Sequence, residues 1–116
     1  MRDKIQDSGR LQLMTEAIGN IEEYLKTVSS AGEFVANKLL CHAVIYNLQC
    51  IGESVYRLSR EYVQSHPDID WSSIEGLRHV LVHDYYSVNM DRVWAIVQKD
   101  LPELKAYLAS EASCGR

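Results

Sequence analysis

Residues 41–62, CHAVIYNLQCIGESVYRLSREY, carry the pattern that decides the fold. Apolar side chains recur along this stretch at alternating steps of three and four, namely Cys41, Val44, Leu48, Ile51, Val55, Leu58 and Tyr62. This spacing places them on one face of an α-helix, and so regular a seam is typical of helices that pack in bundles. The pattern predicts one long helix that opens at the capping box Ser30-Ala31-Gly32-Glu33.

Helical spacing continues on both sides of that stretch, and no segment alternates for long with the period of two that marks a strand. A first helix is expected from about residue 3 to residue 28. Its buried stripe comprises Met14, Ile18, Ile21, Leu25 and Val28. After a loop around Pro67, a short helix is expected to follow Trp71, with a second capping box at residues 72–75 (Ser-Ser-Ile-Glu).

The last helix is expected after an interruption at residues 84–87, with Ser87 or Asn89 as its cap. Its stripe comprises Val93, Val97, Leu101, Leu104 and Leu108. Pro102 lacks a backbone donor, so we expect it to kink this helix or restart it. The fold class is therefore all-α, a four-helix (up to five-helix) bundle, with residues 1–109 as one domain and 110–116 as a frayed tail.

Composition limits the possible functions. The chain has 116 residues, of which 47% are hydrophobic and 24% charged, as in an ordinary globular domain. The formal net charge of −4 argues against nonspecific nucleic-acid binding, so any such function must rest on a local site. No secretory signal or membrane span is evident near the N-terminus or elsewhere, and we expect a cytoplasmic protein without membrane contact.

The three cysteines do not suggest a disulfide framework, because their number is odd and no Cys-x-x-Cys spacing occurs. Cys41 and Cys50 are expected to be small core or interface residues. Trp71 and Trp94 are expected to be core or interface anchors. Gly52 lies in the middle of the long helix, where it permits the close approach of another helix, from the same chain or from a partner chain.

The densest cluster of polar chemistry is RHVLVHDYY, residues 78–86. It combines an arginine, two histidines, an aspartate and two tyrosines with an apolar spine, which makes it the candidate functional site. Each residue also has an ordinary structural interpretation. Arg78 could form a surface ion pair with Glu75 or Asp84, His83 could favour a helix C-terminus, and the tyrosines could simply pack.

The spacing of the candidates restricts their pairing. Arg78 and His83 are five apart, so on a straight helix they lie about 140° from each other. They come together only if the helix ends near His83 or if two copies meet at a symmetric contact. His79 and His83 share a helix face at a spacing that suits a divalent metal, but two ligands are too few for a site, and we expect no metal and no cofactor.

An arginine and a histidine without a metal are sufficient for one reaction. Arginine binds phosphate with its planar fork, and histidine transfers protons near neutral pH. The 2′-hydroxyl of RNA supplies the nucleophile, so such a site would leave a 2′,3′-cyclic phosphate and would not cut DNA. Asn47, Gln49 and Glu53 could be surface residues or a polar patch facing this site. Arg57 and Arg60 are expected on one helix, either in a solvated face or touching phosphate.

The segment around these candidate residues resembles a known family. The segment WSSIEGLRHVLVHDY, residues 71–85, is similar to the signature of the HepT-like HEPN proteins, whose motif is Arg, four residues, His, one residue, Tyr. The stretches NLQCIGE (47–53), LMTEAI (13–18), Val93-Trp94 and DLPEL (100–104) also resemble that family. The resemblance covers residues from about 10 to 108.

The resemblance implies more than the spacing does. It implies a HEPN bundle that forms a homodimer, with two Arg and His motifs facing each other, acting as a metal-independent toxin ribonuclease of a type VII (HEPN/MNT) toxin–antitoxin system. Its partner would be an MNT-type nucleotidyltransferase antitoxin, which in some pairs adds AMP to the motif tyrosine. By this resemblance Arg78 contacts the phosphate of the RNA, His83 is the acid or base, and Tyr85 is the modified residue.

One position departs from the family pattern. The residue after the motif arginine is often asparagine, and here it is His79, which could assist proton transfer or tune His83. His79, Asp84, Glu53 and Asn47 are therefore candidate supporting residues. The competing hypothesis is a non-catalytic subunit that binds nucleotide or substrate for a nucleotidyltransferase, and the acidic net charge and His79 favour it.

Overall fold

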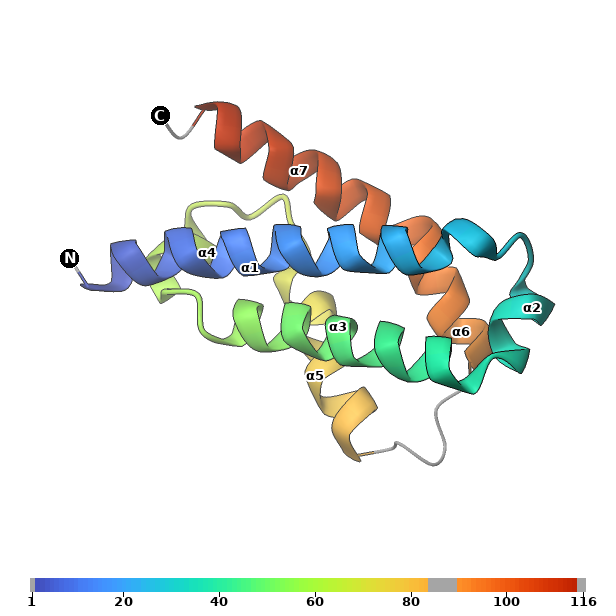
Figure 1. Ribbon diagram of the computed structural model, residues 1–116. Coiled ribbons are helices and arrows are strands. Elements are labelled where there is room, and N and C mark those ends of the chain that lie inside the picture. Colours follow the sequence, from blue (N-terminus) through green and yellow to red (C-terminus); the bar gives the residue numbers. More distant parts are fainter. Residues whose placement is uncertain (1, 84–89, 115–116) are drawn as a thin grey trace.

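The computed structural model describes the backbone of residues 2–83 and 90–114 and the side chains of residues 7–78 and 90–111. All regular structure within these ranges is helical. Helices α1 (Arg2–Tyr24) and α3 (Lys38–Tyr56) run antiparallel side by side, and α7 (Leu101–Cys114) crosses them at an angle (Figure 1). The start of α1 and the end of α7 lie at the same end of the bundle.

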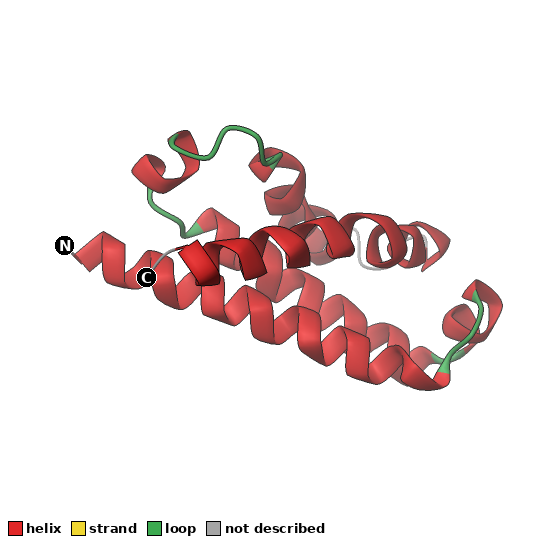
Figure 2. Ribbon diagram, turned by 90° about the horizontal axis from the view of Figure 1, so that it is seen from above, coloured by secondary structure: helices red, strands yellow, loops and turns green. Residues whose placement is uncertain are grey.

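Helix α5 (Trp71–His83) crosses α3 and packs against it. The helix α6 (Met90–Ala95), the π-helical turn η3 (Ile96–Asp100) and α7 follow one another without a loop (Figure 2). The short helices α2 (Ala31–Ala36) and α4 (Arg60–Gln64) connect the long ones. The predicted all-α bundle is confirmed.

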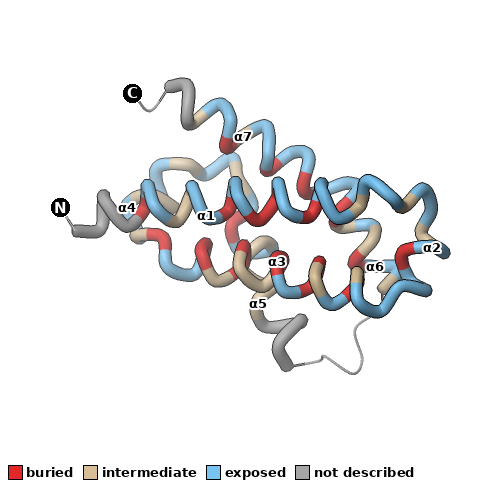
Figure 3. The backbone as a smooth tube through the Cα atoms, in the orientation of Figure 1, coloured by how far each residue is buried: buried red, intermediate tan, exposed pale blue. Residues whose placement is uncertain are grey.

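The apolar stripes meet in one core. Buried residues lie along the faces that α1, α3 and α7 turn toward each other (Figure 3). The members of this core with the least exposure are Met14, Ile21, Phe34, Val44, Leu48, Ile51 and Val93. Cys41 and Trp71 belong to the same core, and Trp94 packs against it beside Phe34, so these predictions are confirmed. Burial of this apolar surface is the main force that assembles the bundle.

The prediction of one unbroken helix from residue 30 to residue 62 is wrong. The backbone leaves the helix at Asn37, whose side chain accepts a hydrogen bond from the Leu40 N–H and caps α3. It leaves the helix again after Tyr56, and Ser59 caps α4 by accepting from the Tyr62 N–H. Asparagine and serine favour such caps over helix interiors. Arg57 and Arg60 therefore lie on opposite sides of a break and do not share a helix.

The two predicted capping boxes have different outcomes. The Ser30 hydroxyl accepts from the Glu33 N–H, which confirms the first box. The Glu33 carboxylate accepts from the N–H of Ser29, one residue before the N-cap, whereas in a standard capping box it accepts from the N-cap residue itself. The second is wrong because α5 begins earlier, at Trp71. Asp70 caps it by accepting from the N–H and the hydroxyl of Ser73.

Pro102 restarts the last helix as expected. Because proline cannot donate to the carbonyl four residues earlier, the backbone widens into η3, where the Leu101 N–H donates to the Ile96 carbonyl. Of the tail expected from Ser110, residues 110–114 belong to α7, and residues 115–116 lie outside the described residues. The expected caps of this helix, Ser87 and Asn89, lie outside the described residues. None of the described helices is long and apolar enough to span a membrane.

Candidate functional site

Arg78 is the one member of the predicted motif whose side chain the structure describes. It extends from α5 to α3, where its Nε donates to Oε1 of Glu53 at 2.6 Å. The two helices approach closely at this point because Gly52 lies against the backbone of Arg78. This hydrogen bond joins Arg78 to a neighbouring helix, since Glu53 is 25 positions away in the sequence.

An aromatic ring also orients the arginine. The guanidinium carbon of Arg78 lies 3.9 Å from the centroid of the Tyr56 ring, the geometry of a cation–π contact. Glu53 and Tyr56 are three apart on α3, so one helix face supplies both contacts. A planar group held by a carboxylate at its edge and a ring on its face has little rotational freedom left.

Glu53 also contacts a second arginine. Its Oε2 accepts from Nε of Arg57 at 2.8 Å, while Oε1 accepts from Arg78. The hydrogen bonds from Arg57 and then Arg78, with the charges of both, lower the pKa of the Glu53 carboxyl below its usual range. Glu53 is therefore ionised at neutral pH.

A groove with a volume of about 740 Å³ lies beside this cluster, between α1 and α3, with Arg78 of α5 in its lining. Its polar and charged lining residues are Arg10, Glu16 and Asn20 from α1, and Asn47, Gln49, Glu53 and Ser54 from α3. The groove combines apolar walls with amide, guanidinium and carboxylate groups. Such a mixture suits a ligand that has both apolar surface and hydrogen-bonding groups.

Asn47, Gln49 and Glu53 line the same groove as Arg78, which agrees with the polar patch rather than with three unrelated surface residues. Asn47 is only 4% exposed. Its amide donates to the Ala43 carbonyl at 2.9 Å and accepts from the Asn20 amide at 3.1 Å. Its bond with Asn20 joins α1 to α3 beside the groove.

The other predicted site residues are placed only in part. His79 lies in α5 and His83 is its last residue, but the side chains of both are outside the described residues, as are Asp84 and Tyr85 altogether. Whether α5 continues beyond His83 concerns residues 84–89, which lie outside the described residues, so the pairing of Arg78 with His83 stays a prediction. No group of three metal-ligating side chains occurs among the described residues, a set that does not include those two imidazoles.

Sequence reasoning missed Tyr56, Arg10 and the connection between Arg57 and Arg78. Tyr56 and Arg57 stand at the end of a helix in a pattern that is equally typical of a solvated face. Only the position of α5, which sequence periodicity does not give, brings Arg78 over Tyr56. The one available signal was Gly52, which indicated that another helix would come close to this turn.

Comparison with known proteins assigns the chain to a family. Residues 14–111 match the family described as Ribonuclease HepT-like. A protein of Thermococcus cleftensis named "Probable ribonuclease HepT" is 33% identical over 95 residues, which cover 82% of this chain and 86% of the relative. One of Methanocaldococcus jannaschii named "Putative RNase MJ1380" is 31% identical over 90 residues, or 78% of this chain and 82% of the relative.

No solved structure matches the chain significantly. The family match covers most of the chain, including the second half of α1, the whole of α3 and α5, and most of α7. The fold is the all-α bundle expected for that family, and Arg78 lies at the α3–α5 contact. The chain belongs to the HepT-like family of HEPN proteins.

Proposed function

We propose that this protein is a metal-independent endoribonuclease that cleaves RNA through Arg78 and His83. The observation that carries the proposal is the placement of Arg78, which is held by Glu53 and Tyr56 beside a groove, on the same helix as His83. The names of the relatives, which describe ribonucleases, support the same activity.

In the proposed reaction Arg78 binds the scissile phosphodiester and stabilises the negative charge that develops on its oxygens. His83 takes the proton of the RNA 2′-hydroxyl or gives one to the leaving 5′-oxygen. The 2′-oxygen attacks phosphorus, the bond to the 5′-oxygen breaks, and the products are a 2′,3′-cyclic phosphate and a free 5′-hydroxyl. Neither step requires a metal or a cofactor. His79 and Asp84 are proposed to support His83.

We propose further that the active species is a homodimer in which the two motifs face each other. Large side chains with apolar surface are exposed on α3, namely Leu39 at 82%, Tyr46 at 65% and Tyr56 at 52%. Exposed groups of this kind mark surfaces that bind another protein. A two-fold contact over α3 and α5 would bring the two Arg78 side chains to one cleft.

The proposed biological role is that of the toxin in a type VII toxin–antitoxin pair in the cytoplasm. The antitoxin would be an MNT-type nucleotidyltransferase that transfers AMP to the hydroxyl of Tyr85. AMP attached two residues from His83 would exclude RNA by bulk and by the repulsion of its phosphate charge. This regulation rests on the family motif, since Tyr85 lies outside the described residues.

The experiment that tests the activity is RNA cleavage by the full chain in excess chelator. Wild type is expected to cut single-stranded RNA, and Arg78→Ala is expected to lose at least about a hundredfold in rate, the range for loss of a charge-stabilising group. Equal cleavage by Arg78→Ala would remove that residue from the mechanism. Binding of RNA without any cleavage by wild type would instead support the non-catalytic subunit.

A further inference from the structure

Two arginines from different elements converge on one carboxylate at the edge of the groove. Arg57 lies just after α3 and Arg78 lies in α5, and each donates its Nε to a different oxygen of Glu53, at 2.8 Å and 2.6 Å. The two oxygens belong to one carboxylate, so the two guanidinium groups are close neighbours. With Glu53 ionised, these three side chains together carry one net positive charge, in a chain whose overall charge is −4.

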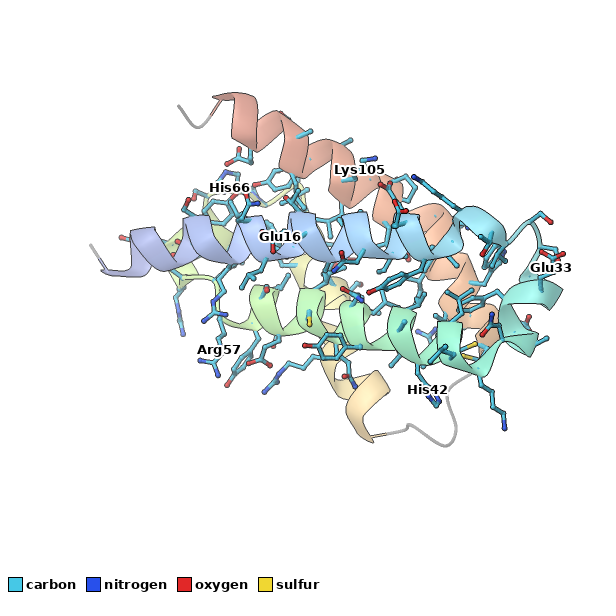
Figure 4. All side chains as sticks on the ribbon, in the orientation of Figure 1. Glu16, Glu33, His42, Arg57, His66 and Lys105 are labelled. Carbon is cyan, nitrogen blue, oxygen red and sulfur yellow. The ribbon has the colours of Figure 1, made fainter. Side chains whose placement is uncertain are left out.

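The two arginines differ in exposure. The side chain of Arg78 is 28% exposed and is covered on one face by Tyr56, whereas that of Arg57 is 54% exposed. Figure 4 shows Arg57 at the end of α3, on the outer face of the bundle. The pair therefore leads from the site proposed for the scissile phosphate outward to the surface, the direction that a bound strand must take to leave the site.

We propose that Arg57 forms a second phosphate subsite, which binds the phosphodiester next to the one held by Arg78. The proposal rests on the proposed function, because that function puts the first phosphate at Arg78. A guanidinium has five N–H donors, so Arg57 can keep its Nε on Glu53 while its terminal nitrogens donate to a phosphate oxygen. Glu53 fixes the spacing of the two cations before the strand arrives.

A purely structural role for Arg57 makes a different prediction. Glu53 and Arg57 are four apart, the spacing of an ordinary helix-surface ion pair, and a cation at a helix C-terminus interacts favourably with the helix dipole. Both effects alter only stability. Neither changes how binding of a polyanion responds to salt, so the salt dependence separates the two roles.

The test uses the full chain and a single-stranded 2′-O-methyl RNA of about a dozen nucleotides, which cannot be cut because its 2′-oxygens carry no proton. Its Kd is measured between about 50 and 200 mM salt. Loss of one phosphate contact lowers the slope of log affinity against log salt by about 0.7 for a single strand. Arg57→Gln is expected to show this loss, with several-fold weaker binding at low salt, whereas Arg57→Lys is expected to keep the wild-type slope.

Arg60→Gln is the matched control, because Arg60 is an exposed arginine three positions further on that begins α4. It is expected to leave the slope unchanged. Three results would overturn the subsite. The salt slope could be unchanged in Arg57→Gln, it could fall equally in Arg57→Gln and Arg60→Gln, or wild type could fail to bind the probe. The two proposals can fail separately. If the salt slope depends on Arg57 but the protein never cuts RNA, the subsite is supported and the nuclease activity is refuted. If the protein cuts RNA but the salt slope does not depend on Arg57, only the subsite is refuted.

Discussion

Gly52 touches the backbone of Arg78 so closely that a Cβ atom on Gly52 would lie 2.7 Å from the Arg78 nitrogen and 3.2 Å from its Cα. These atoms belong to the α5 main chain and cannot rotate away. The absence of a side chain at Gly52 therefore sets the distance between α3 and α5. That distance in turn lets Arg78 reach Glu53, the next residue on α3.

Gly52→Ala is expected to destabilise the protein although alanine favours helices. Overpacking of this kind costs about 1–3 kcal/mol, and the helix-propensity gain of about 1 kcal/mol offsets only part of it. Urea unfolding would measure the net loss. Gly76→Ala is the control, because a Cβ at that helical position meets nothing within 4 Å, and it is expected to stabilise. A Gly52→Ala protein as stable as Gly76→Ala would contradict this account.

Asp7 is expected to contribute to stability through one tertiary contact. Its carboxylate accepts from the N–H of Ser59 at 2.7 Å and from its hydroxyl at 2.6 Å, which joins α1 to the start of α4. Asp7→Ala leaves a partly buried N–H unsatisfied, and we expect a loss of about 1–3 kcal/mol in the free energy of unfolding.

The control for Asp7 is Glu23→Ala, which removes an exposed ion pair with Lys26. Such pairs contribute at most about 1 kcal/mol. If the two variants unfold at the same urea concentration, the Asp7 contact has no special weight.

Much of the fold was predictable from sequence, because helical periodicity reports which faces are buried. Met14, Ile18 and Ile21, for instance, are all buried as their spacing indicated. The breaks at Asn37 and Ser59 were missed because the apolar seam continues across them and hides the two caps. The start of α5 was misplaced because aspartate and serine both favour the N-cap position, so Asp70 and Ser72 were both suitable N-cap residues. The backbone conformation shows that Asp70 is the one that caps the helix.

The candidate site was predictable in a narrower sense. The motif identified Arg78, and the expected polar patch of Asn47, Gln49 and Glu53 lines the groove beside it. The contacts that hold Arg78 could not be read from sequence, since its partner is 25 positions away and the choice depends on how α5 crosses α3.

Stability is expected to fall at alkaline pH because of the tyrosine pair that joins α4 to α7. The hydroxyls of Tyr62 and Tyr107 lie 2.6 Å apart, and that of Tyr62 donates to Glu111 at 3.0 Å. Burial raises the pKa of both tyrosines, and for Tyr62 the bonds to Tyr107 and Glu111 raise it further. The unfolded chain loses these protons near pH ~10, whereas the folded chain retains them.

Above pH ~10 the unfolded state binds fewer protons than the folded state, so the free energy of unfolding decreases as the pH rises toward the folded pKa values. Below pH ~10 both states keep these protons, and the two tyrosines do not make stability depend on pH. Tyr62→Phe should reduce this slope between about pH 9 and 11. Tyr24→Phe, on a more exposed tyrosine at the end of α1, should not. Identical slopes in wild type and Tyr62→Phe would contradict the assignment.

Modification of Tyr85 is expected when the protein is incubated with ATP and the nucleotidyltransferase of its own pair. The mass should rise by one or more AMP groups on the peptide that contains Tyr85, and RNA cleavage should fall in proportion. Tyr86→Phe is the neighbouring control and should be modified like wild type. A Tyr85→Phe protein that gains the same mass would place the acceptor elsewhere.

The central claim is that Arg78 and His83 act on a single phosphodiester by activating the 2′-hydroxyl of RNA. The most direct measurement is the chemical end of the product formed in excess chelator. The account predicts a 2′,3′-cyclic phosphate from RNA, no product from the matching DNA, and loss of cleavage in a folded His83→Ala protein. A 5′-phosphate product, or cleavage that persists in His83→Ala, would contradict it.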